Sequence, residues 1–158
     1  MKKTKNIKIV FFIYVAIVIR VIIFKYPWEK LKTVIDTWEK GMILAGLESA
    51  NFTLFKTIRM YVDYSYKLNS FENLAGNIVV FIPLGFLLPY LQQRCKKFSV
   101  LMINALVFVL GIEVFQLFSA FGAFDVDDIL LNCVGAGLGW LFHMWWQQIK
   151  GKDENIST

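Results

Sequence analysis

The sequence contains few of the residues from which metal centres and disulfide-stapled domains are built. It has two cysteines, Cys95 and Cys133, and one histidine, His143. Two cysteines are too few for a disulfide framework, and we predict no bridge between them, because one lies in a basic loop and the other in an apolar run. A single histidine excludes a multi-histidine metal site. No zinc-ligand spacing, phosphate-binding loop or dinucleotide fingerprint is present, and we predict no cofactor and no resident metal.

Charged residues are also scarce, at 18% of the chain, whereas hydrophobic residues make up 57%. Soluble domains typically have roughly 45–50% apolar and about 25% charged residues. The 15 Phe, 6 Tyr and 5 Trp residues suit lipid contact and anchoring at the membrane interface. The composition therefore predicts an integral membrane protein. The net charge of +5 is explained below by membrane topology, and we predict no binding of nucleic acid.

Four apolar runs predict an all-α, polytopic protein in which residues 1–158 form one membrane domain. The predicted transmembrane helices are about 9–24, 73–91, 98–118 and 128–146. The first follows the basic start MKKTKNIK, a pattern that signal peptides share. No small-x-small cleavage site comes after it, so we interpret it as an uncleaved helix. Pro83 and Gly85 lie within the second run, where neighbouring helices can satisfy the freed carbonyl group.

The distribution of basic residues predicts the orientation of these helices. Of the 17 Lys and Arg residues, 9 lie at the amino end, in the 92–97 loop, or at Lys150 and Lys152. Basic residues mark cytoplasmic loops, so we expect a multi-pass protein of the plasma membrane with both termini in the cytoplasm. Residues 25–72 would then be external. They contain seven further basic residues, which long translocated segments tolerate.

Part of this external segment has helical periodicity. Apolar residues recur at steps of three and four: Trp28, Leu31, Ile35, Trp38, Met42 and Ala45. The pattern predicts one amphipathic helix, which either lies in the membrane interface or packs on the rim of the bundle. Residues 51–61 are less periodic, and we expect a loop with a short helical piece there.

Polar side chains inside the apolar runs are predicted to lie at one depth. Glu113 precedes the external end of the third helix by five residues, about 8 Å at roughly 1.5 Å per residue, and Gln116 shares its helix face. Asn77 and Asn132 each lie four residues inside the external end of their own helix. These four residues should therefore form one polar layer in the outer third of the membrane. Such a layer is consistent either with hydrogen bonds that join helices or with a pocket for a lipid head group.

Three carboxylates, Asp125, Asp127 and Asp128, stand in the turn before the fourth helix. Aspartate is a preferred N-cap, and acidic residues favour the positive end of the helix dipole. Three acids in four residues exceed the needs of a cap, so a divalent cation is an alternative interpretation. Further along, Gly135 and Gly139 form a small-xxx-small face that predicts close helix packing.

The sequence resembles the VanZ-like family of small bacterial membrane proteins. The matching motifs, in the family's order and spacing, are NFTLFKTI (51–58), ENLAGNIVVFIPLGFLLP (72–89), IEVFQ (112–116) and FDVDDILLNCVGAGLG (124–139). Two departures stand out: the family often has Pro at the position of Leu54, and many members have Arg shortly before the first Asp of the acidic turn. The resemblance implies association with teicoplanin resistance and with the cell envelope, without an agreed biochemical activity.

The resemblance implies six candidate ligand-binding residues: Asn77, Glu113, Gln116, Asp125, Asp128 and Asn132. Four of them, Asn77, Glu113, Gln116 and Asn132, are also the residues that the depth argument places in one layer. We hypothesise that they bind the head group of a membrane lipid or of a lipid-linked cell-wall precursor. The alternative is an intramembrane enzyme acting on a lipid-linked envelope substrate, with Glu113 or Asp128 as general base or metal ligand. A transporter is disfavoured because the inner halves of the helices carry little polarity and no inverted repeat is visible.

Overall fold

The computed structural model describes residues 2–23, 28–64, 70–119 and 122–156 of the chain. The described residues are helical apart from connecting segments and an isolated parallel β-bridge between Asn51 and Asp125, which confirms the all-α prediction. In chain order the elements are α1 (Lys2–Ile23), α2 (Trp28–Asp36), α3 (Lys40–Ser49), α4 (Lys56–Asp63), α5 (Ser70–Leu91), the short 3₁₀ helix η1 (Gln93–Lys96), α6 (Phe98–Ser119) and α7 (Val126–Ile156).

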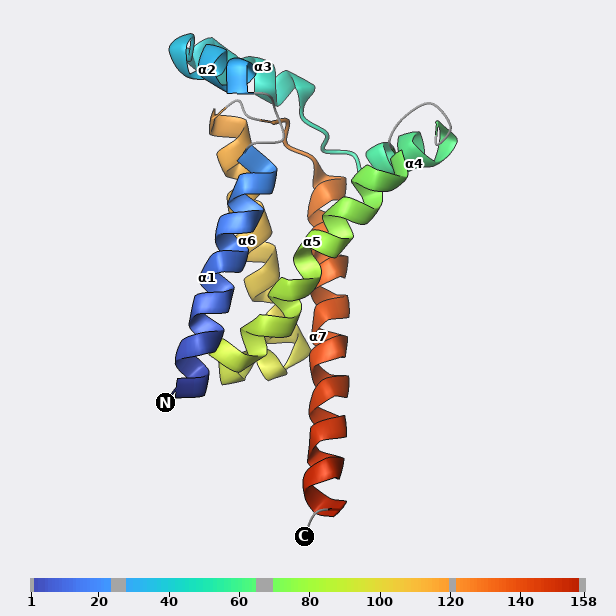
Figure 1. Cartoon of the computed structure of the whole chain (residues 1–158). Helices are drawn as coiled ribbons and strands as arrows, with labels where there is room; N and C mark the ends of the chain where they lie inside the picture. The colour runs from blue at the N-terminus through green and yellow to red at the C-terminus, as the bar shows by residue number, and fades with distance from the viewer. Residues whose placement is uncertain (1, 24–27, 65–69, 120–121, 157–158) are drawn as a thin grey trace.

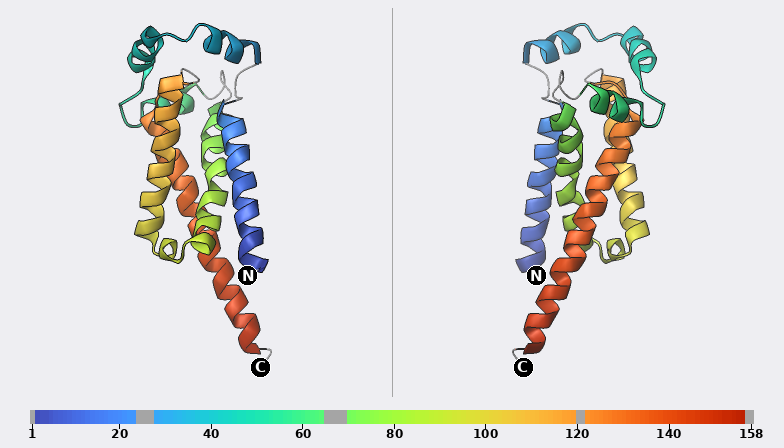
Figure 2. Two further views of the ribbon diagram at one scale, coloured as in Figure 1. Left: turned by 90° about the vertical axis from the view of Figure 1, so that its left-hand side faces the viewer. Right: turned by 90° about the vertical axis from the view of Figure 1, so that its right-hand side faces the viewer.

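Four long helices, α1, α5, α6 and α7, run side by side as a bundle (Figures 1 and 2). The helices α2 and α3 lie across one end of it, which we call the α2–α3 end, and α4 lies beside the start of α5 there. The first residues of α1 and the last turns of α7 are at the opposite end, where α7 extends beyond the other helices. Residues 2 and 156 are therefore on the same side of the bundle.

Three of these helices are long and apolar enough to cross a membrane: Glu72–Leu91, Phe98–Ser119 and Val126–Gly151. Much of their surface points outward, since only 22% of the most apolar window of α6 is buried. Exposed apolar side chains such as Val107, Leu141 and Phe142 would be unfavourable in water but suit contact with lipid. Length, composition and outward apolar surface together identify a membrane protein.

The closest helix packing is between α5 and α7, and glycines make it possible. A Cβ atom on Gly135 would lie 2.1 Å from the carbonyl oxygen of Ile78, and one on Gly139 would lie 1.9 Å from that of Ile82. Gly85 makes the reciprocal approach, because a Cβ atom there would lie 1.8 Å from the carbonyl oxygen of Ala136. No side chain fits at these three positions. The small-residue face thus brings the two backbones into contact, as the sequence predicts.

The first helix packs on the other side of α5. The Tyr14 hydroxyl donates a hydrogen bond of 3.0 Å to the carbonyl oxygen of Val80. That bond places a polar group of α1 against α5 inside an otherwise apolar contact, where Tyr14 and Val18 are both buried with Phe81 and Leu84. The contact fixes α1 beside α5 and leaves a gap between α1 and α6, which is described below.

Two features differ from the sequence-based expectation. The single amphipathic helix expected over residues 28–45 is interrupted at 37–39, so that α2 and α3 are separate. The Thr37 hydroxyl bonds back to the Thr33 carbonyl oxygen, and the Trp38 indole donates to the Phe118 carbonyl oxygen of α6. These bonds satisfy groups that a continuous helix would use differently.

The second difference concerns His143, whose position near the carboxyl end of the fourth predicted helix (128–146) predicts an interface residue. It is fully buried between α5 and α7, with its Nδ1 atom 3.1 Å from the Phe86 carbonyl oxygen and its ring against that of Tyr90. The carbonyl is an acceptor, so Nδ1 carries the proton and donates. The close α5–α7 crossing, which a hydropathy pattern does not encode, explains this burial.

Candidate functional site

A polar cavity of about 230 Å³ lies among α5, α6 and α7, toward the α2–α3 end of the bundle. We call it the head-group cavity. Its polar lining consists of carboxylates and amides from three helices: Glu72, Asn73, Asn77, Glu113, Gln116, Asp128 and Asn132. The described lining includes no Lys, Arg or His side chain. Val21 of α1 and Phe81 of α5 contribute apolar walls.

The deepest polar groups of this cavity are Glu113 and Asn132, which are 2% and 4% exposed. The Glu113 carboxylate accepts a hydrogen bond of 3.1 Å from the backbone N–H of Asp125. The Asn132 Oδ1 atom is buried and has no hydrogen-bond partner among the described residues. An amide oxygen left in this state costs free energy. A ligand that donates a hydrogen bond to Asn132 Oδ1 would remove this cost.

Asp128 is the second acid of the cavity, and it is linked to α5. The Asn77 amide nitrogen donates a hydrogen bond of 2.5 Å to Asp128 Oδ1. That bond joins α5 to the first turn of α7. Because the Asn77 amide donates to the Asp128 carboxylate, this bond helps to set the orientation of both side chains. The carboxylate is thereby presented as a hydrogen-bond acceptor.

A second polar cluster lies beside the cavity and consists of Asn51, Thr57, Asp125 and Asp127. We call it the acidic clamp. Asp127 is fully buried, and its carboxylate accepts hydrogen bonds from three backbone N–H groups around the start of α4: those of Phe55 (2.6 Å), Thr57 (2.8 Å) and Ile58 (3.2 Å). The start of α4 is thus capped by a carboxylate 70 residues away in the chain. Backbone donors at a helix start are a favourable environment for a negative charge.

Asp125 completes the clamp. Its Oδ1 atom accepts from the backbone N–H of Asp127 at 2.8 Å and from the Asn51 amide at 2.9 Å, and its Oδ2 atom accepts from the Thr57 hydroxyl at 2.6 Å. The first of these bonds makes Asp125 the N-cap of α7. The backbone of Asn51 pairs with the residues on either side of Asp125, accepting from Val126 and donating to Phe124. Residues 51–58 are therefore fastened to the start of α7.

Backbone strain accompanies this clamp. Phe55 immediately precedes α4 and has φ 65°, the single positive value for a non-glycine among the described residues. The left-handed conformation costs an L-residue roughly 1–2 kcal/mol. It directs the N–H of Phe55 toward Asp127, and the resulting bond of 2.6 Å offsets part of the cost.

The acids also affect a neighbouring group of α4. Burial raises the pKa of Tyr61, and the negative charges of Asp128 and Asp125 raise it further. The phenol therefore stays protonated, and able to donate a hydrogen bond, above the pH range in which tyrosine ordinarily ionises. Asp128 and Asp125 thus disfavour a further negative charge on this neighbour.

Five of the six candidate ligand-binding residues line the head-group cavity: Asn77, Glu113, Gln116, Asp128 and Asn132. Asp125 is outside the lining, because both of its carboxylate oxygens are used by the clamp. Its backbone N–H nevertheless reaches Glu113, so the clamp positions a cavity residue.

Sequence reasoning missed the parts played by Asn51, Thr57 and Asp127. The motif containing Asn51 and Thr57 was visible, but its pairing with the acidic turn was not.

Among the described residues, no group of three or more His, Cys, Asp or Glu side chains could hold a metal ion. The three carboxylates of the turn point to different partners, with Asp125 and Asp127 in the clamp and Asp128 in the cavity.

Comparison with known proteins places the chain in a family. Protein VanZ of Enterococcus faecium is 36% identical over 72 residues, which are 44% of this chain and 43% of the relative. The match thus spans less than half the length of that relative. No solved structure matches. The profile of the VanZ/LLP1 family matches residues 11–147, which include the second half of α1, the clamp, the cavity and most of α7. This chain belongs to the VanZ/LLP1 family of membrane proteins.

Proposed function

We propose that this protein crosses the plasma membrane four times and binds an amine-bearing lipid head group in the head-group cavity. The fourth span would be α1. Its apolar run and its hydrogen bond from Tyr14 to α5 support this assignment. Its first turns carry Lys5 and Lys8 at the same end of the bundle as the basic loop of Arg94, Lys96 and Lys97. That end would be cytoplasmic, and α2, α3 and α4 would lie outside.

The observation that carries the head-group proposal is the buried, unpartnered Oδ1 atom of Asn132 beside two carboxylates. Glu113, Asp128 and Asn132 all offer acceptor atoms to the same space. A primary ammonium group has three donors and a positive charge, so it matches these acceptors in number and sign. Hydrogen bonds between charged partners are also stronger than neutral ones.

The charge of the lining argues for the same ligand class. A phosphate or diphosphate group inside the cavity would meet Glu113 and Asp128 without a cation among the described lining residues. Basic side chains occur instead on α4, where Lys56 and Arg59 are exposed. The phosphate of a zwitterionic head group would be better placed near that helix, at the membrane surface. The preferred ligand is therefore a zwitterionic lipid, or an envelope precursor that presents an amine.

We connect this binding to glycopeptide resistance. The resemblance to the VanZ-like family, together with the relative named VanZ in Enterococcus faecium, supports a role in teicoplanin resistance. In this role the protein would change the lipid surface that teicoplanin contacts. Sequestering or reorienting an amine-bearing lipid at the outer leaflet would change the local charge of that surface. Deletion and complementation in the host, scored for teicoplanin against vancomycin, tests this connection.

Binding itself is tested with purified protein in lipid nanodiscs made of phosphatidylglycerol and a small fraction of fluorescent phosphatidylethanolamine. The double variant Glu113→Gln, Asn132→Ala should bind the probe about ten-fold more weakly or worse, because a hydrogen bond to a charged group is worth roughly 1.5–3 kcal/mol. Asn104→Ala is the matched control. Asn104 is a half-buried amide of α6 whose nitrogen bonds to the Val100 carbonyl oxygen, and it is outside the cavity lining. Equal affinity in the double variant and the control would overturn the proposal.

A further inference from the structure

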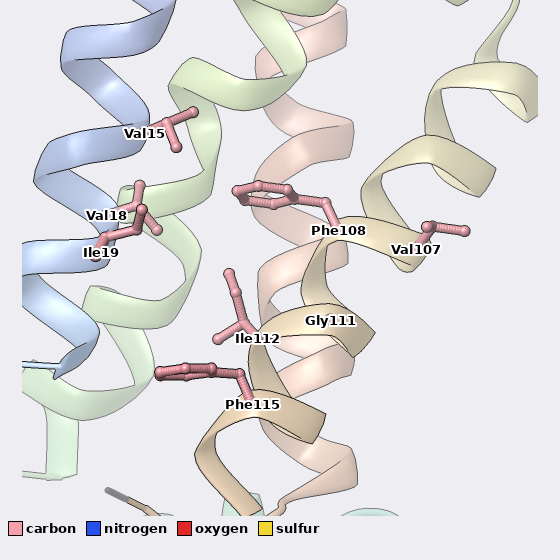
Figure 3. A pocket seen from close by; sticks show the side chains of 8 residues that line it. All are labelled: Val15, Val18, Ile19, Val107, Phe108, Gly111, Ile112 and Phe115. Carbon is pink, nitrogen blue, oxygen red and sulfur yellow. The ribbon is translucent and has the colours of Figure 1, made fainter. Parts of the chain in front are cut away.

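An apolar groove of about 510 Å³ separates α1 from α6. Figure 3 shows Phe108, Ile112 and Phe115 of α6 projecting toward α1, as expected for residues spaced by four and three on one helix face. The facing wall on α1 consists of Val15, Val18 and Ile19. Every described lining residue is apolar. The groove is thus a hydrocarbon-like surface between two helices of the bundle.

The groove adjoins the head-group cavity. Ile112 lines both spaces, and the next residue of α6, Glu113, is a carboxylate of the cavity. On α1 the order is the same, since Ile19 lines the groove and Val21 lines the cavity. Each of the two helices therefore contributes to the groove and to the cavity with residues that lie within one turn of each other. This continuity is the main reason to treat the two spaces as one site.

The groove also has the length of one lipid chain segment in a single leaflet. Its α6 residues run from Val107 to Phe115, about 12 Å at roughly 1.5 Å per residue. Half of a bilayer's hydrocarbon core is about 15 Å thick. These residues occupy the half of α6 that ends at the α2–α3 end. A chain in the groove would therefore lie in the same leaflet as a head group in the cavity.

We propose that the groove holds the acyl chain of the aminophospholipid whose ammonium group occupies the head-group cavity. The lipid would enter sideways from the bilayer, between α1 and α6. The inference rests on the proposed function and adds the class of ligand and the route. A polyprenyl-linked diphosphate is the less suitable occupant, because its anionic head would meet the two carboxylates of the cavity, Glu113 and Asp128. A second copy of the chain would leave the polar cavity unfilled.

Gly111 allows a direct test, because it lines the groove and a Cβ atom there meets nothing within 4 Å. Gly111→Phe would add a ring at the groove wall, at a position where its Cβ atom meets no other atom. Gly111→Ala leaves most of the space open and is the matched control. The probe is phosphatidylethanolamine with a diazirine midway along one acyl chain, in nanodiscs of phosphatidylglycerol. Photolysis followed by mass spectrometry maps the labelled peptides.

In the unmodified protein, labelling should concentrate on residues 15–19 and 107–115 and should be lost on adding unlabelled phosphatidylethanolamine. Phosphatidylglycerol should not compete. The Gly111→Phe variant should lose this competed labelling, and Gly111→Ala should keep it. Because the map of the unmodified protein needs no substitution, the inference stays testable even if a variant folds poorly.

The outcomes separate the inference from the proposed function. If Glu113→Gln with Asn132→Ala loses binding while Gly111→Phe keeps the same competed labelling, the head group binds but the groove does not hold its chain. If neither variant changes binding, both proposals fail. Labelling spread over other exposed faces, such as that of Leu141 and Phe142 on α7, would show bulk lipid contact only and would overturn the inference. Preferential competition by a polyprenyl diphosphate would overturn the choice of occupant.

Discussion

The substitution Asp127→Asn tests the acidic clamp that fastens residues 51–58 to the start of α7. The carboxylate is fully buried and accepts three backbone N–H bonds. Asparagine keeps one acceptor oxygen and turns the other into a donor that faces N–H groups. At least one charge-assisted bond is lost and a buried donor is left unpaired, which should cost about 2–4 kcal/mol.

The cost should appear first as local opening, which native-state hydrogen exchange measures. Exchange of the amides of Phe55, Thr57 and Ile58 should accelerate by about 30-fold or more, since each 1.4 kcal/mol is a factor of ten. Amides in the middle of α5 serve as the internal reference. Asp63→Asn is the control, because Asp63 is an exposed carboxylate at the end of α4, and surface changes of this kind are usually within about 0.5 kcal/mol. Unchanged protection at residues 55–58 in Asp127→Asn would refute the reasoning.

Three further predictions concern backbone strain, helix packing and a buried thiol. Phe55→Gly should stabilise the clamp by up to about 1 kcal/mol, because glycine adopts φ 65° without steric cost; a lower unfolding temperature in detergent would contradict the strain argument. Gly139→Leu should prevent α5 from packing on α7, since a Cβ atom would lie 1.9 Å from the Ile82 carbonyl oxygen. The yield of monodisperse protein should fall, whereas Gly41→Leu, with nothing within 4 Å, should leave it unchanged. Cys95 is fully buried and burial raises its thiol pKa, so maleimide at pH 7 should label it only after unfolding, and rapid labelling of the native protein would show that this loop is open.

The polar layer could be predicted from sequence because depth along a helix is simple geometry. A rise of about 1.5 Å per residue from a predicted helix end is enough to place Glu113, Asn132 and Asn77 at one height. The glycine face of α7 was predictable for a similar reason, since its period is read directly from the chain. Each of these inferences uses a pattern within one helix. The short loops between consecutive helices then indicate which helices are neighbours.

The clamp and the burial of His143 could not be predicted in this way. The bonds between Asp127 and the backbone of residues 55–58 join positions about 70 apart, and no periodic pattern encodes such a pairing. His143 lies near the end of an apolar run, where interface contact and burial look alike in hydropathy. The close packing of α5 on α7 buries the His143 side chain. The groove beside Gly111 likewise depends on the spacing of α1 and α6, which sequence does not specify.

The central claim is that the head-group cavity receives an amine-bearing lipid head group. A structure determined in nanodiscs that contain phosphatidylethanolamine tests it most directly. We expect density for an ammonium group within hydrogen-bond distance of Glu113, Asp128 and Asn132, continuing to a phosphate near the membrane surface. A cavity that holds only water in the presence of this lipid, with Asn132 Oδ1 hydrated, would contradict the account.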